Sequence, residues 1–174
     1  MIRATFLALV FFSLFSFAQA QNKAASNVPG FRSIEWGSHI DSIEVEGRKL
    51  NFKEDEESSR ANAYILPKDR LNIGTVKLKK INYIFNDEGR FTRVFMIGDK
   101  EFKEDMEFIL SYKFGAPSDI RSLGYSSFKQ WKVGSQGVDF ILTSYSDREV
   151  FTLTIESKWE YINRNKKNIN VDDF

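Results

Sequence analysis

The chain contains no cysteine and a single histidine, and these two absences exclude several kinds of functional site. A chain without cysteine has no disulfide framework, no thiolate nucleophile and no cysteine-ligated zinc or iron–sulfur cluster. One histidine also excludes metal sites that are built from a pair of histidines. The formal net charge of +1 gives no sign of a nucleic-acid partner. We therefore expect no cofactor, no metal and no nucleic acid to be bound.

The composition is that of an ordinary globular domain, with 42% apolar and 28% charged residues. This balance excludes a disordered, collagenous or polytopic membrane chain. The 174 residues suffice for one domain and are too few for two domains with cores of their own. Without disulfides, the domain must be stabilised by its hydrophobic core alone.

Residues 1–20 have the three-part pattern of a secretory signal peptide. Arg3 supplies a positive charge, an apolar run extends from Phe6 to Ala18, and small residues precede the expected cleavage after Ala20. The alternative is a membrane anchor, but the run is shorter than the about twenty residues that a spanning helix needs. We expect a periplasmic or secreted protein with no stable membrane span after cleavage. No cysteine lies at the cleavage point, so a lipid anchor is not expected either.

The mature chain is predicted to fold as one domain, residues 31–160, between a flexible lead-in at 21–30 and a C-terminal tail at 161–174. A short helix is expected from Ser38, its N-cap, to Gly47, and a longer helix between Asp99 and Gly115. Alternating apolar residues predict six strands, at 61–66, 75–86, 91–97, 127–133, 137–145 and 149–157. The segment 86–89 is typical of a tight hairpin turn.

One helix followed by three strands occurs twice in this order, which suggests an internal duplication. Residues 74–97 and 134–157 share five identities in 24 positions, where ordinary residue frequencies give roughly one or two. Two hairpins of similar length would also share turn and core positions, so this alternative stays open. We predict an α+β fold, with a mainly antiparallel sheet of about six strands and two helices on one face, from two α-β-β-β pseudo-repeats at about 31–97 and 98–157.

Three short segments carry a resemblance to small exported bacterial domains. They are the entry Phe31–Ser38, the strand Tyr83–Asn86 and the helix end Phe114–Pro117. Together with the doubled layout of helix and strands, they make the chain similar to the tandem-repeat folds of the β-lactamase-inhibitor-protein and BamE-like outer-membrane-assembly groups. The resemblance implies a binding or assembly protein rather than an enzyme.

No catalytic constellation stands out along the chain. Ser38, His39 and Asp41 include the residue types of a hydrolase triad, but neighbours at a helix start point in different directions. The acidic run Glu54–Glu57 lacks the alternating spacing and the glycine of a calcium loop, so we interpret it as a solvated loop. The sequence has no Gly-rich phosphate loop and no Gly-x-Ser-x-Gly elbow. We therefore predict a protein that is not an enzyme.

The apolar residues of the strands divide between the two faces of the expected sheet. We expect the odd-numbered apolar residues to pack beneath the helices: Tyr83, Phe85, Phe91, Phe95, Ile141 and Tyr145. The apolar residues of the opposite parity would then form an exposed patch, and they are the candidate partner-binding residues: Ile84, Val94, Met96, Phe140 and Leu142. Two alternatives remain: other segments or sheet curvature cover this patch, or a β-bulge exchanges the faces.

These observations favour an exported, non-catalytic binding domain that engages a protein or a cell-envelope component through the open face of its sheet. One alternative is an envelope hydrolase that uses paired carboxylates, because the chain has 24 acidic residues. The other is a carrier that holds a small apolar ligand between sheet and helices in a cavity lined by Phe and Tyr.

Overall fold

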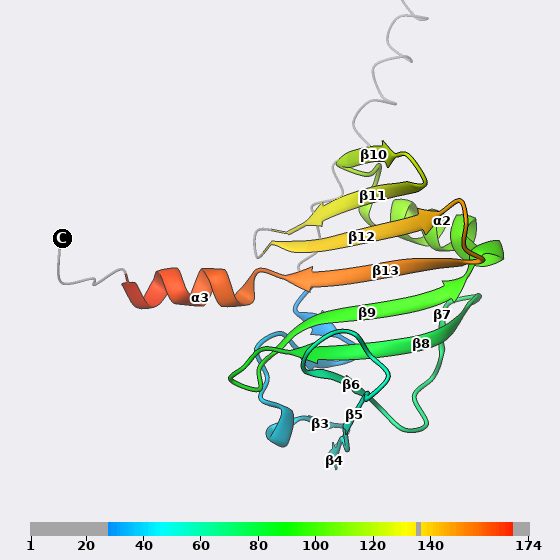
Figure 1. Ribbon diagram of the computed structural model, residues 1–174. Coiled ribbons are helices and arrows are strands. Elements are labelled where there is room, and N and C mark those ends of the chain that lie inside the picture. Colours follow the sequence, from blue (N-terminus) through cyan, green and yellow to red (C-terminus); the bar gives the residue numbers. More distant parts are fainter. Residues whose placement is uncertain (1–27, 135–136, 169–174) are drawn as a thin grey trace, which may run out of the picture.

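The computed structural model describes residues 28–134 and 137–168, and its main feature is a nine-stranded antiparallel sheet (Figure 1). The strand order is β10-β11-β12-β13-β9-β8-β6-β5, and β7 pairs with β8 beside this path. The strands are β5 (Lys53–Glu54), β6 (Ala63–Ile65), β7 (Asn72–Ile73), β8 (Val76–Phe85), β9 (Phe91–Asp99), β10 (Asp119–Leu123), β11 (Ser126–Val133), β12 (Val138–Tyr145) and β13 (Val150–Ser157). The remaining elements are the strands β1 (Gly30–Phe31), β2 (Ile34–Glu35), β3 (Glu44–Val45) and β4 (Arg48–Lys49), the 3-10 helices η1 (Ile40–Ser42) and η2 (Lys100–Phe102), and the α-helices α2 (Lys103–Phe114) and α3 (Trp159–Asn168).

The antiparallel sheet with few helices is of the α+β type, as predicted from the sequence. All six predicted strands are present, but the sheet is larger because β5, β7 and β10 also belong to it. These three strands are short, and a short segment gives little alternation by which a strand can be recognised. The expected signal peptide, 1–20, and most of the lead-in lie outside the described residues.

The predicted first helix, Ser38 to Gly47, is wrong. In its place the chain forms the single turn η1, followed by the hairpin of β3 and β4. The residue that caps η1 is His39, whose Nδ1 accepts a hydrogen bond from the backbone N–H of Asp41 at 3.3 Å. The backbone N–H of Ile40 donates to the carbonyl of Gly89, in the β8–β9 turn, at 2.9 Å, so its hydrogen bond is made with the sheet and not within a helix. So short a helix is marginal on its own, and these contacts with the sheet replace its internal hydrogen bonds.

The second predicted helix is confirmed as α2, which packs on one face of the sheet (Figure 1). Its side chains Met106 and Leu110 are buried against the sheet. The helix ends at Gly115, whose φ of 86° favours glycine. The Gly115 carbonyl accepts a hydrogen bond from the indole N–H of Trp131 on β11 at 2.9 Å, which attaches the end of α2 to the sheet.

The described part of the chain ends in a second α-helix, which includes the first residues of the segment predicted as a tail, 161–174. Helix α3 begins at Trp159, directly after β13, and continues through residues 161–168 in a direction away from the sheet (Figure 1). It does not cover the sheet beside α2, so the predicted pair of helices on one face is not present. The ring of Trp159, the first residue of α3, packs against the backbone of Gly37, and a Cβ atom on residue 37 would lie 2.2 Å from that ring. Glycine is therefore required at this contact.

Two β-bulges determine which strand residues face α2. One extra residue, Lys79, shifts the register on β8, so that Leu78 pairs with Gly98 but Lys80 with Ile97. A second extra residue, Thr92, shifts the register near the other end, between the Ile84 and Phe85 pairs. A single extra residue exchanges the faces of everything that follows along the strand. The odd-numbered aromatics of β8 and the even-numbered residues of β9 therefore point to the same side.

Four of the five candidate partner-binding residues consequently lie in the core beneath α2. Val94 and Met96 are 0% exposed, Phe140 is 6% and Leu142 is 2% exposed, all within the main hydrophobic cluster. The prediction that they form an exposed patch is wrong. Ile84 is also buried, at 7% exposed, but in a small separate cluster on the opposite face. The bulge at Thr92 explains the reversal on β9, because strict alternation assigns Phe91 and Val94 to different faces. Strand β12 has no bulge, and there the sequence prediction simply chose the wrong face for Phe140 and Leu142.

Candidate binding surface

The sheet face opposite α2 carries three rows of side chains that run across four strands, and we name it the open sheet face. Its residues, row by row, are Arg93, Glu156 and Asp139, then Phe95, Thr154, Ile141 and Gln130, then Ile97, Thr152, Thr143 and Phe128. All of these except Phe95 are half-buried. The mixture of threonine, isoleucine and phenylalanine is typical of a surface that is amphipathic rather than purely hydrophilic. Of the candidate residues named from the sequence, only Ile84 lies on this side of the sheet.

One end of the open sheet face is closed by the loop between β5 and β6. Asp55, at the start of this loop, is 8% exposed and accepts hydrogen bonds from Lys80 Nζ at 2.9 Å and Asn82 Nδ2 at 2.5 Å. Burial alone would raise the pKa of Asp55, but the hydrogen bonds and the charge of Lys80 outweigh it, so the pKa is lowered from its ordinary value. The acidic run that the sequence suggested to be solvated therefore has one buried member, which anchors the loop against β8.

A pair of arginines lies beside this loop. The guanidinium carbon of Arg60 lies 3.4 Å from the centroid of the Phe95 ring, in a cation–π contact. Arg93 precedes Phe95 by two residues on the same face of β9, so the two guanidinium groups are neighbours. Burial and the charge of Arg93 lower the pKa of Arg60, although an arginine in a protein stays protonated.

Among the described residues, an acidic partner is present for Arg93 but not for Arg60. Arg93 forms an ion pair with Glu156 across the β9–β13 pair, but its Nε–H is buried without a hydrogen-bond acceptor. Arg60 has no ion pair with any carboxylate in the part of the chain that the structure describes. This end of the open sheet face therefore combines an excess positive charge with unused donors, an arrangement that suits an anionic group.

Two carboxylates also stand side by side on this face, since Asp139 is directly opposite Glu156. Asp139 lies 3.7 Å from Lys158, and Glu156 pairs with Arg93, so each carboxylate has its own cation. Over the described ranges 28–134 and 137–168, no group of three or more potential His, Cys, Asp or Glu ligands is brought together. The envelope-hydrolase alternative remains a prediction, and Asp139 with Glu156 is the carboxylate pair that this face offers for it.

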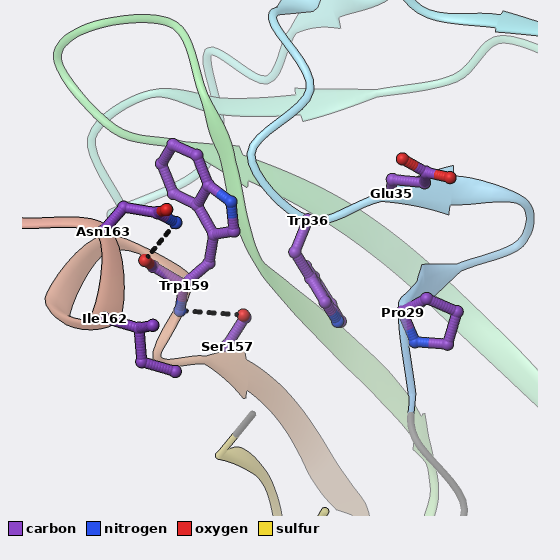
Figure 2. A pocket seen from close by; sticks show the side chains of 7 residues that line it. All are labelled: Pro29, Glu35, Trp36, Ser157, Trp159, Ile162 and Asn163. Carbon is purple, nitrogen blue, oxygen red and sulfur yellow. Dashed lines mark hydrogen bonds between the residues drawn. The ribbon is translucent and has the colours of Figure 1, made fainter. Parts of the chain in front are cut away.

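A surface cleft of about 320 Å³ lies where α3 leaves the sheet (Figure 2). Its lining residues are Pro29, Glu35, Trp36, Ser157, Trp159, Ile162 and Asn163. Its polar groups are largely engaged in holding α3: Ser157 Oγ accepts from the backbone N–H of Trp159 at 3.1 Å, and Asn163 Nδ2 donates to the Trp159 carbonyl at 2.8 Å. The indole N–H of Trp36 donates to the Val28 carbonyl at 2.9 Å. The residues of the cleft therefore hold α3 beside the N-terminal strands β1 and β2.

A larger groove, of about 610 Å³, lies between the start of α2 and the β10–β11 turn. It is lined mainly by serine, lysine and glutamate side chains, together with Tyr125 and Tyr145. Neither this groove nor the cleft beside α3 is lined by phenylalanine. Neither is thus the Phe- and Tyr-lined cavity that the apolar-carrier alternative requires, and that alternative remains a prediction.

No protein-family model, curated protein or solved structure matches this chain. Within the residues that the structure describes, no helix has the length and apolar character needed to cross a membrane. The surface must therefore be interpreted from its own geometry.

The residues that sequence reasoning missed are Arg60 and Arg93, together with the apolar side chains Phe95, Ile97 and Ile141 beside them. Arg60 comes from a loop, and nothing in a linear sequence indicates that a loop arginine folds back onto a distant strand. The apolar residues carried a usable signal. They alternate with the true core residues, so locating the bulge at Thr92 would have assigned Phe95 and Ile97 to the open sheet face. Ile141 lies between the core residues Phe140 and Leu142, and it required only the correct choice of face for β12.

Proposed function

We propose that the protein is an exported, non-catalytic binding protein that holds a protein partner of the cell envelope on the open sheet face. The observation that carries the proposal is the arginine pair, where Arg60 covers Phe95 and has no acidic partner among the described residues, and where the guanidinium group of Arg93 lies beside it. Unused charged donors beside half-buried apolar side chains favour a partner that supplies the missing acceptor.

The partner's chemistry follows from the rows of side chains. An acidic side chain would be held by the guanidinium group of Arg60, with the positive charge of Arg93 beside it. Apolar side chains of the same partner would contact Ile97 and Ile141 in the neighbouring rows, and these contacts supply the hydrophobic part of the binding energy. The threonines between them offer hydroxyl groups to backbone amides. The chemistry points to a protein segment with an acidic residue next to apolar ones.

Export and origin belong to the same proposal. The signal pattern at 1–20, with cleavage after Ala20, supports a periplasmic or secreted location. The order of the strands supports a duplication, because β5-β6-β8-β9 and β10-β11-β12-β13 are two four-stranded meanders that meet at β9 and β13. A common plan with the β-lactamase-inhibitor-protein and BamE-like folds would agree with a binding role, and we propose it on the sequence resemblance.

The test is capture of partners from the native cell envelope by immobilised residues 21–174, with the bound proteins identified by mass spectrometry. Ile97→Asp and Arg60→Ala are expected to reduce capture of a specific partner at least about tenfold, as loss of a central contact does. Phe108→Asp is the matched control, because Phe108 lies on the outer side of α2 and is 70% exposed. Capture should also weaken at high salt, since Arg60 binds by charge.

Circular dichroism must first show that the variants are folded. Undiminished capture by both Ile97→Asp and Arg60→Ala, or equal loss with Phe108→Asp, would exclude the open sheet face as the binding surface.

A further inference from the structure

Strand β10 forms one edge of the sheet and leaves one side of its backbone unpaired in the described chain. It pairs with β11 alone, and four of its five residues are exposed. Ile120 is 63% and Leu123 is 61% exposed. Exposed edge strands are usually blocked by proline, by a bulge or by a repelling charge, because a free edge otherwise accepts another strand. The register of β10 with β11 contains no bulge, and β10 contains no proline.

The hairpin that joins β10 to β11 determines which backbone groups are free. The two-residue turn is Gly124-Tyr125, and Gly124 has a φ of 57°. The residues that flank such a turn, Leu123 and Ser126, form a hydrogen-bonded pair, and pairs of this kind alternate along the ladder. Ile120 and Ser122 are therefore at the positions whose N–H and C=O groups point away from β11. The free edge presents two complete donor–acceptor sets.

The side chains of β10 are complementary to a second copy of the same strand. Asp119 and Arg121 lie on one face, where Arg121 Nη2 and Asp119 Oδ2 are 2.7 Å apart, and Ile120 lies on the other. When two copies are placed antiparallel with Ile120 opposite Ile120, each Asp119 stands opposite the Arg121 of the other copy. Opposite charges at directly paired positions stabilise a strand pair, and two aliphatic side chains do the same on the other face.

We infer that β10 is a self-association edge, at which two copies of this chain pair antiparallel about Ile120 and join their sheets into one. In this register the N–H of each Ile120 donates to the Ile120 carbonyl of the other copy. The competing register, centred on Arg121, places two arginines opposite each other and is disfavoured. The contact is isologous, so it ends at a dimer rather than a filament.

A five-residue strand pair is a small interface, so the dimer should be weak and concentration-dependent. Sedimentation velocity of residues 21–174, from about 10 µM to about 1 mM, is expected to show a rising dimer fraction. Arg121→Asp and Asp119→Arg should each reduce dimer formation at least about tenfold, because each places two like charges opposite each other. The double variant D119R/R121D restores both opposite-charge pairs and should recover the dimer.

Arg148→Asp is the matched control for the charge reversal, because Arg148 is exposed and lies outside β10, between β12 and β13. This variant should keep the dimer. Circular dichroism and one-dimensional proton NMR confirm that each variant keeps its fold. A wild-type protein that stays monomeric at 1 mM would overturn the inference, as would a double variant that remains monomeric like the single variants. Arg121 contacts Phe128 at one end of the open sheet face, so the two proposals are separated by a different variant. Arg60 covers Phe95 on β9, and three strands lie between β9 and β10, so Arg60→Ala should leave the dimer unchanged while it reduces partner capture.

Discussion

Replacing two consecutive residues of β9 tests the assignment of the sheet faces. Met96 is 0% exposed, stands opposite Leu153 and belongs to the core beneath α2. Ile97, the next residue, is half-buried on the open sheet face, opposite Thr152. Truncating a fully buried methionine to alanine typically costs about 2–5 kcal/mol, since it removes buried area and leaves a cavity. Ile97→Ala removes side-chain atoms that remain partly in water, so its cost should be about 1 kcal/mol.

These values translate into separable melting temperatures. A chain of this length loses about 2–4 °C for each kcal/mol, so a cost of about 3 kcal/mol for Met96→Ala corresponds to a decrease of about 6–12 °C. Ile97→Ala should decrease the melting temperature by about 2–4 °C. Thermal unfolding followed by circular dichroism, and urea titration of both variants, measure the difference. An Ile97→Ala cost equal to or above that of Met96→Ala would refute the two bulges and the face assignment derived from them.

Two further predictions concern single contacts. Asp55→Ala should destabilise the protein by about 1–3 kcal/mol at pH 7, because it leaves Lys80 and Asn82 without their acceptor. The folded-state pKa of Asp55 is lowered, so the carboxylate stabilises the fold above its ordinary value of 3.8, and this contribution is lost as the pH falls through the folded-state pKa. Urea titrations should therefore show a smaller difference in the free energy of unfolding between wild type and Asp55→Ala at about pH 3 than at pH 7. An equal difference at both pH values would contradict the explanation given for the lowered pKa of Asp55. Gly98→Ala should reduce the free energy of unfolding by about 2 kcal/mol or more, because the added Cβ would lie 2.4 Å from the Phe151 ring. The control Gly47→Ala places its Cβ in open space and should reduce it by about 1 kcal/mol, because the φ of 72° is unfavourable for alanine. Equal reductions in urea titrations would show that the Phe151 ring moves aside.

The parts of the fold that could be predicted from the sequence are those with strong local signals. Helix α2 has an apolar stripe and a glycine stop, and the β8–β9 turn has the composition of a tight turn, so both were identified. The prediction of a first helix from Ser38 to Gly47 was wrong because the spacing of Ile40 and Ile43 fits a single helical turn as well as a short helix. Strand β10 was missed because its exposed side chains have no core face that would make them alternate.

On β9 the predicted faces were reversed because the strand contains a bulge, which alternation alone does not locate. Alternation predicts a face correctly only up to the first bulge, and Lys79 and Thr92 each shift the register by one residue. Val94 and Met96 were therefore assigned to the surface although they are in the core. The arginine pair depends on a loop that folds across the sheet, and such a long-range contact has no signature in the residues near Arg60.

The meeting of β9 and β13 at the centre of the sheet has a consequence for how the chain folds. Helix α2 and strands β10, β11 and β12 all lie between these two strands in sequence, yet the two pair along most of their length. Contacts so distant along the chain carry a large loop-closure cost and slow the search for the native state, to about milliseconds to seconds for sheets dominated by non-local pairs. Each of the two four-stranded meanders can form early, because its strands pair with neighbours that are close in sequence. Until the central pair closes, both halves expose an unprotected strand edge, and this interval is when the chain is most prone to aggregate.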